Sequence, residues 1–160
     1  MDRAYALLNV KGIVEKSDEW VIEGIASTPT TDRMGDIVEP LGAKFKLPMP
    51  LLWQHNSSQP VGRVEFARPT AKGIPYTAHL PKIAEAGVLK DRVDEAVQSI
   101  KYRLVAAVSI GFRGVAGAVE NLKEGGLRFK EWEWLELSLV TIPANAEATI
   151  TSIKSLDSAQ

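Results

Sequence analysis

Hydrophobic and polar residues alternate with a period of two along much of the sequence, which is the pattern of β-strands with one buried face. The alternation predicts strands over residues 5–10, 19–28, 51–55, 61–66, 74–80, 104–112 and 128–142. Residues 29–50 have no clear period and predict a long loop, with a short extended piece at residues 36–39. Polar turns are expected at residues 56–60 and 121–126.

One segment has the period of a helix instead. Val93, Ala96, Val97 and Ile100 recur at spacings of three and four residues, which predicts an amphipathic helix over residues 91–102. A second, shorter helix is expected over residues 146–154. Strands therefore outnumber helices, which favours a mostly β (α+β) fold: a closed or sandwiched, mostly antiparallel sheet with peripheral helices. No repeat or linker divides the 160 residues, so we expect one domain over residues 1–160.

Composition and charge exclude several classes of function. Hydrophobic residues make up 45% of the chain and charged residues 24%, as in ordinary globular proteins. The net charge of −1 shows no basic excess for nucleic acid or an anionic membrane. The absence of cysteine excludes thiol catalysis and cysteine-ligated metals. No signal peptide or membrane-spanning run is recognisable, and we expect no cofactor, no metal, no nucleic acid and no membrane partner.

Ser109 is the serine that draws attention, because it lies inside an apolar predicted strand. Val105, Ala107, Ser109 and Gly111 alternate onto one face, and their small side chains leave room for a substrate backbone beside the hydroxyl. A half-buried serine bonded to a nearby carbonyl is the simpler interpretation of this pattern. The surrounding residues come close to the Gly-x-Ser-x-Gly elbow of the hydrolases, but that elbow needs a helix after the serine, and extended residues follow here.

The two histidines of the chain, His55 and His79, are the candidate general bases. His55 is expected at the polar end of a strand, where its ring keeps a pKa near neutrality, as general-base catalysis requires. His79 lies within an alternating strand. Both histidines also fit purely structural roles. A serine hydrolase with this sequence would use one of them, or else a Ser–Lys pair.

A single carboxylate, Glu136, interrupts the apolar stretch at residues 134–142. Strict alternation places Trp134, Glu136 and Ser138 on one face, and Leu135 and Leu137 on the other. A carboxylate in this setting needs water, a hydrogen bond or a charged partner, because burying it alone is costly. An imidazole nitrogen is one suitable partner, which would give Glu136 the third role of a catalytic triad, with Ser138 helping to orient the pair. A glutamate on an edge strand, pointing into water, is the alternative.

Three parts of the sequence resemble one known family. They are Ser27–Asp36, Leu51–Asn56 leading to Pro60–Arg63, and Val108–Phe112 followed by Glu136–Asn145. In their order along the chain and in their residues, these segments resemble the prohead proteases, or head maturation proteases, of tailed bacteriophages. The resemblance extends from about residue 8 to residue 153.

This resemblance implies a closed β-barrel with peripheral helices, like that of the herpesvirus assemblins. It implies a serine endopeptidase that cleaves the scaffold, or the scaffolding region of the major capsid protein, and also itself. Such cleavage takes place inside the assembling prohead in the cytoplasm of the bacterial host, and a homo-oligomer is compatible with it. The family's nucleophile falls on Ser109, its histidine on His55 and its acidic residue, with the weakest match, on Glu136; His79 is a distant competitor for the third position.

Two alternatives to a peptidase remain open from the sequence. The chain is a non-catalytic β-barrel module for capsid assembly, with Ser109 and His55 as fold residues, or it is a serine hydrolase that acts on esters. Catalysis predicts the Ser109 hydroxyl within hydrogen-bond reach of a His55 nitrogen, with some looseness when no substrate is bound. The donors to an oxyanion are expected to be backbone amides, either next to Ser109 or in the turn after Ile142.

Overall fold

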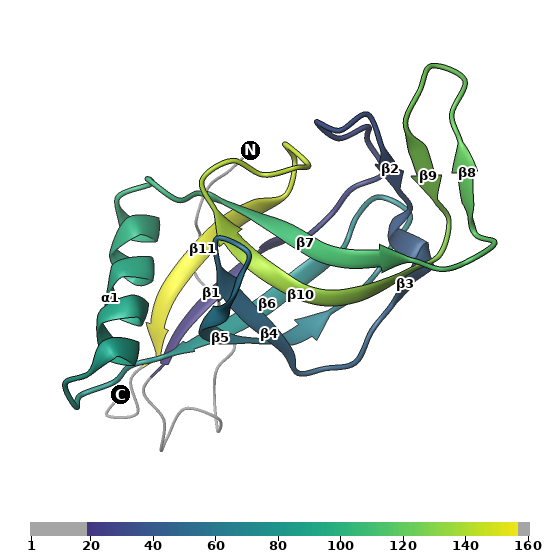
Figure 1. Ribbon diagram of the computed structural model, residues 1–160. Coiled ribbons are helices and arrows are strands. Elements are labelled where there is room, and N and C mark those ends of the chain that lie inside the picture. The colour runs from purple at the N-terminus through teal and green to yellow at the C-terminus, as the bar shows by residue number, and fades with distance from the viewer. Residues whose placement is uncertain (1–18, 157–160) are drawn as a thin grey trace.

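The computed structural model describes residues 19–156, so the strand predicted at residues 5–10 lies outside the described part. Strands dominate this part of the chain (Figure 1). The elements are β1 (Glu19–Ile25), β2 (Ile37–Val38), a short 3₁₀ helix (Pro40–Gly42), β3 (Ala43–Lys44), β4 (Met49–Trp53), β5 (Asn56–Ala67), β6 (Pro75–Pro81), α1 (Val88–Lys101), β7 (Ala107–Gly114), β8 (Val119–Asn121), β9 (Leu127–Phe129), β10 (Trp132–Val140) and β11 (Thr149–Leu156).

Seven strands close into a barrel, in the order β10, β4, β5, β6, β1, β11 and β7, with β7 pairing back onto β10. Most neighbours are antiparallel; β10 pairs in parallel with β4 and, at its start, with β3. The prediction of a mostly β fold with a closed sheet is therefore confirmed. A separate small sheet of β2, β9 and β8 stands beside the barrel, and its β8–β9 hairpin projects from the body (Figure 1).

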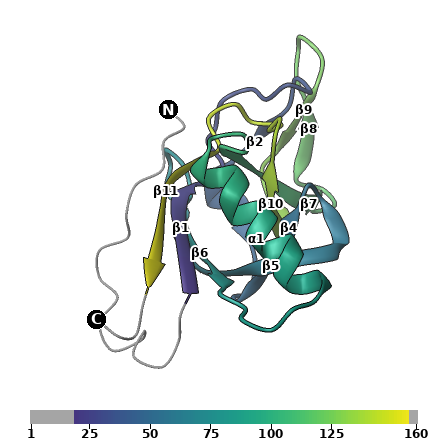
Figure 2. The same cartoon turned by 90° about the vertical axis from the view of Figure 1, so that its left-hand side faces the viewer.

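The helix α1 lies across one end of this barrel (Figures 1 and 2). Its buried residues are Val93, Ala96, Val97 and Ile100, and all four belong to the main hydrophobic core. Full burial of a large aliphatic side chain is worth about 1.5–3 kcal/mol relative to exposure. These contacts hold the helix in place. The helix begins at Val88, three residues before the predicted start.

The polar stretch at residues 56–60, predicted as a loop, belongs to β5. Strands β4 and β5 form a hairpin whose loop is only Gln54 and His55, because Trp53 pairs with Asn56. The ladder is irregular between Leu51 and Trp53, and the extra residues of β5 are accommodated there. Polar residues and proline are tolerated at such irregular positions, so the turn chemistry of this stretch was misleading.

Three further boundaries differ from the predictions. Residues 149–154, predicted as part of a helix, belong instead to strand β11, which pairs along β1; their β-branched residues suit a strand better. The long strand predicted at 128–142 is divided into β9 and β10. The strand predicted from residue 104 begins only at Ala107, and Leu104 is exposed.

Candidate active site

The turn between β4 and β5 holds His55 in an unusual backbone conformation. Gln54 and His55 have φ angles of 52° and 58°, a region that residues other than glycine adopt only at a cost. The turn is fixed by its contacts with β10: the Gln54 N–H donates to the Leu139 carbonyl at 2.9 Å, and the His55 N–H donates to the Ser138 hydroxyl oxygen at 3.1 Å. The side chains of Gln54 and Thr141 are also bonded at 2.9 Å. These bonds offset the strain and set the position of the imidazole.

A β-bulge on β10 turns Glu136 to the outer face of the barrel. In the ladder with β7, Trp134 pairs with Phe112 and Glu136 with Gly111, which leaves Leu135 as the extra residue. The alternation therefore shifts: Trp134 joins the core and Leu135 is 45% exposed. The face assignment predicted for these two residues was wrong, because simple alternation does not anticipate a bulge.

The outer face brings His55, Glu136 and Ser138 together. The Nδ1 atom of His55 is hydrogen-bonded to Oε2 of Glu136 at 2.8 Å, and the Ser138 hydroxyl donates to Oε1 of the same carboxylate at 2.8 Å. The His55 side chain is 43% exposed and that of Glu136 only 17%. Because the carboxylate occupies Nδ1, the other ring nitrogen, Nε2, is left to exchange protons.

The pKa of His55 is raised above its ordinary value of 6.5. The hydrogen bond to Glu136 is the main cause, and the charge of that carboxylate adds to it, while partial burial of the ring acts in the opposite direction. A raised pKa means that Glu136 stabilises the protonated imidazole. A base that collects a proton during a reaction needs this stabilisation.

Ser109 lies on β7 directly across from Ser138, so the two side chains share the outer face. The residue is 5% exposed. Among the described residues its hydroxyl has no hydrogen-bond partner, and none joins it to His55. The structure thus places Ser109 on the strand next to Glu136, two residues from its partner Gly111, without a direct bond to the imidazole of His55.

Gly111 makes the approach of Glu136 possible. A Cβ atom at position 111 would meet Oε2 of Glu136 at 2.2 Å and its carboxyl carbon at 2.5 Å. The carboxylate therefore lies over a bare stretch of β7 backbone, two residues from Ser109. Its place on the strand makes this glycine part of the site.

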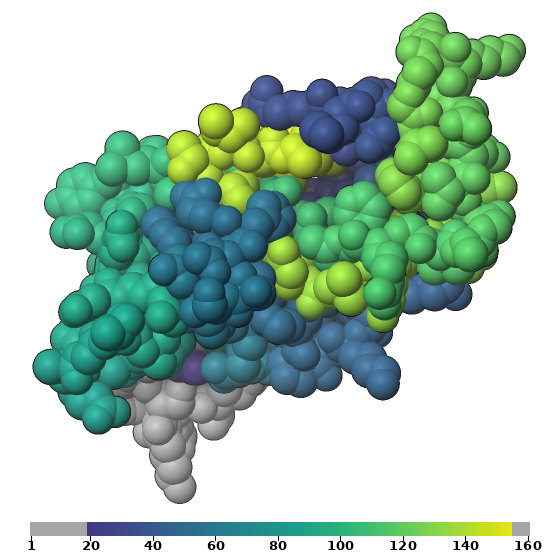
Figure 3. Space-filling view, in the orientation of Figure 1, coloured from purple at the N-terminus to yellow at the C-terminus, as the bar shows by residue number. Residues whose placement is uncertain are grey.

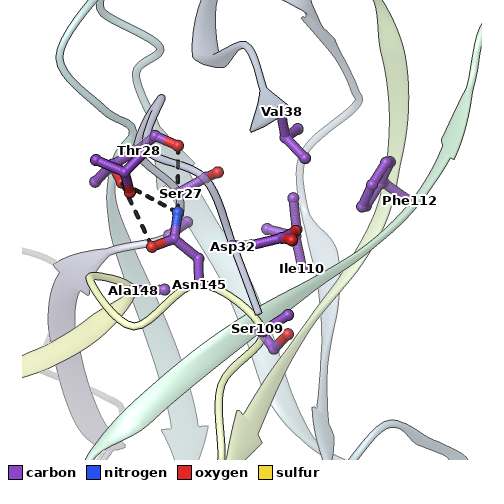
Figure 4. A pocket seen from close by; sticks show the side chains of 12 residues that line it. Ser27, Thr28, Asp32, Val38, Ser109, Ile110, Phe112, Asn145 and Ala148 are labelled. Carbon is purple, nitrogen blue, oxygen red and sulfur yellow. Dashed lines mark hydrogen bonds between the residues drawn. The ribbon is translucent and has the colours of Figure 1, made fainter. Parts of the chain in front are cut away.

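Ser109 also borders a hollow between β7 and the segments before β2 and β11, which the space-filling view shows (Figure 3). The cavity has a volume of about 30 Å³. Ile110 and Phe112 form part of its apolar lining, and Asp32 and Asn145 part of its polar lining (Figure 4). The hollow is thus a recess at the proposed nucleophile.

The second histidine belongs to a different part of the barrel wall. Nδ1 of His79 is 3.0 Å from Oε1 of Glu19, and Arg63 bonds the other oxygen of that carboxylate at 3.0 Å. Burial acts to raise the pKa of Glu19, but the hydrogen bonds from His79 and Arg63 outweigh it and lower the pKa. In the described range no hydrogen bond joins His79 to the residues around Glu136.

Sequence reasoning selected His55, Glu136 and Ser109, but it missed two features of the site. The need for glycine at position 111 arises from the position of Glu136 and has no local signal. The β4–β5 turn was missed because neither Gln54 nor His55 is a residue typical of positive φ. Within residues 19–156 there is no cluster of three metal-ligating side chains, and none of the helices is long and apolar enough to cross a membrane.

Comparison with known proteins identifies a family for this chain. Residues 22–160 match the family described as caudovirus prohead serine protease. The chain is 56% identical to the capsid polyprotein of Pseudomonas phage PAJU2 over 99% of its own length, but it spans only 23% of that relative. It is 25% identical to the prohead protease of Escherichia phage T5, over 92% of the chain and 70% of the relative. The chain belongs to the caudovirus prohead serine proteases, a family of serine peptidases associated with the maturation of phage capsids.

Proposed function

We propose that this chain is a serine endopeptidase in which Ser109 is the nucleophile, His55 the general base and Glu136 the orienting acid. The observation that carries the proposal is the 2.8 Å bond between His55 and Glu136, on the same face as Ser109 and one strand away from it. The arrangement supplies the three chemical roles of a triad. The family match supports the reaction class.

The reaction begins when Nε2 of His55 takes the proton of the Ser109 hydroxyl as its oxygen attacks a peptide carbonyl. Hydroxyl and imidazole come into bonding distance on substrate binding, since such bonds tighten in the reactive complex. Glu136 stabilises the imidazolium, which then protonates the leaving amine. Water, deprotonated by His55, attacks the acyl-enzyme, releases the new carboxylate and restores the serine. Backbone amides next to Ser109, or in the turn after Ile142, stabilise the oxyanion.

The substrate we propose is the major capsid protein or its scaffold, cleaved inside the assembling prohead in the host cytoplasm. The relative named capsid polyprotein supports a link between this protease and the capsid polypeptide. Cleavage of the protease's own polypeptide belongs to the same proposal. We further propose one domain over residues 1–160, a barrel related to that of the herpesvirus assemblins, and activity without a cofactor.

Co-expression tests this function. The chain, as wild type or as Ser109→Ala, is produced together with the capsid polypeptide of the same phage, and the length of that polypeptide is followed by mass spectrometry. Shortening is expected with the wild type and with a Ser58→Ala control at an exposed position of β5, but not with Ser109→Ala. Unchanged shortening by Ser109→Ala would remove Ser109 as the nucleophile.

A non-catalytic capsid-assembly module is the second candidate. Two observations on Ser109 favour it: the residue is only 5% exposed, and its hydroxyl makes no bond to His55 in the described structure. Under this alternative the wild type leaves the capsid polypeptide intact but changes the assembled particles. Electron microscopy of the co-expressed particles, together with the mass of the polypeptide, separates the two candidates.

A further inference from the structure

The barrel is not hydrogen-bonded equally around its circumference. Strand β1 pairs with β11 along its whole length, whereas β11 pairs with β7 only at Thr149 and Ala107. No strand in the described range pairs with β7 beyond Ala107 on this edge, since β10 lies on the other. The strand that carries Ser109 therefore has a free edge over residues 109–113.

The backbone groups that face this edge follow from the alternation of the strand. The Val108 N–H donates to the Ala148 carbonyl, on the side of β11. Because backbone groups alternate between the two edges, the N–H and C=O of Ile110 and Phe112 face the same side as those of Val108. The backbone groups of Ile110 and Phe112 thus offer hydrogen-bond donors and acceptors suited to an added extended strand.

The hollow at this edge has a distinct electrostatic character. Asp32 is the only charged side chain among its described lining residues (Figure 4). Its Oδ1 accepts the N–H groups of Met34 and Asp36, both at 2.9 Å, and no bond to Oδ2 is found in the described structure. One carboxylate oxygen is therefore left for a ligand.

From these observations we infer that the free edge of β7 binds the polypeptide substrate as an added strand, with a cationic side chain of the substrate opposite Asp32. This rests on the proposed function, because Ser109 must be the nucleophile for the hollow to adjoin the cleaved bond. Since Ser109 itself borders the hollow, the side chain whose charged end lies at the hollow belongs to a residue next to that bond. An unpaired carboxylate in a recess selects lysine or arginine by charge.

The test uses peptides prepared from a bacterial lysate with a glutamate-specific protease, which keeps internal lysine and arginine. The wild type, Ser109→Ala and Asp32→Asn are incubated with this mixture, and cleavage sites are mapped by mass spectrometry. Lysine and arginine are expected at one position next to the cleaved bond at about tenfold their background frequency. Asp32→Asn keeps the Oδ1 acceptor of the turn, and should reduce this enrichment below about twofold.

A second pair of variants tests whether the substrate uses the hollow, by enlarging a side chain that lines it. Ala144→Leu fills it from the lining, whereas Ala86→Leu changes an exposed residue in the loop before α1. The first should lower the cleavage rate at least about tenfold by raising KM, and the second should leave it unchanged. Thermal unfolding of both variants shows whether Ala144→Leu remains folded.

The results separate this inference from the proposed function. Suppose that the wild type cleaves and Ser109→Ala does not. The role of Asp32 would then be overturned if lysine and arginine are not enriched at the cleavage site, or if their enrichment persists in Asp32→Asn. Normal KM in a folded Ala144→Leu would overturn the use of the hollow. If the wild type cleaves nothing, or Ser109→Ala cleaves equally, the proposed function itself fails.

Discussion

Glu136 makes two side-chain hydrogen bonds at once, one with His55 and one from Ser138. Ser138 is fully buried and also accepts the backbone N–H of His55. A single hydroxyl therefore fixes both the carboxylate and the turn that carries the imidazole. We expect it to act as a positioning residue, because it touches the acid and the base without facing a reacting atom.

The charge of Glu136 should be visible in the pH dependence of cleavage. His55 must be neutral to act as a base, so activity should rise with pH through a pKa above 6.5. Glu136→Gln removes the charge that raises this pKa, so the midpoint should move to lower pH. The maximal kcat/KM should fall by at least about tenfold, but less than in His55→Ala. A profile of Glu136→Gln that overlays that of the wild type would exclude Glu136 from the site.

Removal of the Ser138 hydroxyl should slow the reaction without weakening substrate binding. Ser138→Ala leaves Glu136 with one bond fewer, a loss of about 1–2 kcal/mol, or about tenfold in kcat. KM should stay the same, and the pKa in the pH profile should shift. Ser152→Ala is the control, because Ser152 is equally buried but lies on β11. A change confined to protein stability, with kcat and pH profile intact, would contradict the positioning role.

At the scale of the elements, the bulge on β10 decides which side chains reach the site. Without the bulge at Leu135, strict alternation would place Trp134 on the outer face beside Glu136. With it, Trp134 packs in the core and donates its indole N–H to the Glu136 carbonyl at 2.9 Å. The bulge thus separates the acid from the large aromatic residue that precedes it.

Two leucines on β10 test this bulge by their contributions to stability. Leu137 is fully buried, and Leu137→Ala should lower the free energy of unfolding by about 2–5 kcal/mol. Leu135→Ala should cost much less, because Leu135 is 45% exposed. Urea unfolding measures both values. Equal losses would mean that the two side chains share a face, as in a strand without a bulge.

The contact between Gly111 and Glu136 gives a prediction that joins β7 to β10. In Gly111→Ala the added Cβ would lie 2.2 Å from Oε2, so the carboxylate must move away from His55. Cleavage should fall at least about tenfold, and the pKa of His55 should move down toward its ordinary value. Gly87→Ala is the matched control, because nothing lies within 4 Å of a Cβ there. An unchanged, still raised His55 pKa in folded Gly111→Ala would rule out this contact.

The sequence predicted the strand content and the residues of the site better than it predicted how they meet. Period-two alternation found most strands, because one face of each is buried in the barrel. It failed at residues 149–154, where pairing with β1 overrides the helical interpretation. It also failed at the turn of His55, where contacts with β10 stabilise a backbone conformation that Gln54 and His55 do not favour locally. Both failures come from long-range contacts, which a local pattern does not contain.

For the whole molecule, the seam between β11 and β7 is the feature that matters most. The barrel is continuous except beyond the pair of Thr149 and Ala107, where residues before β2 and β11 form the walls of the hollow (Figures 1 and 3). A barrel with hydrogen bonds along the whole β11–β7 seam would pair both edges of the strand that carries Ser109. This one leaves an edge for another extended segment.

Amide hydrogen exchange on the free chain checks the seam independently of activity. The Ile110 and Phe112 amides face the unpaired edge and should exchange quickly. The Ser109 amide faces β10 and should be protected, as should Ile22 between β6 and β11. Fast and slow amides should therefore alternate along β7. Uniform protection would mean that another segment already pairs with this edge.

Covalent labelling of the nucleophile tests the proposed peptidase most directly. The wild type and His55→Ala are treated with a fluorophosphonate, which reacts with serines activated by a neighbouring base, and the labelled residue is located by mass spectrometry. The structure predicts one adduct, on Ser109, formed at least about a hundredfold faster in the wild type than in His55→Ala. Label on another serine, or equal labelling of Ser109 in both proteins, would contradict activation of Ser109 by His55.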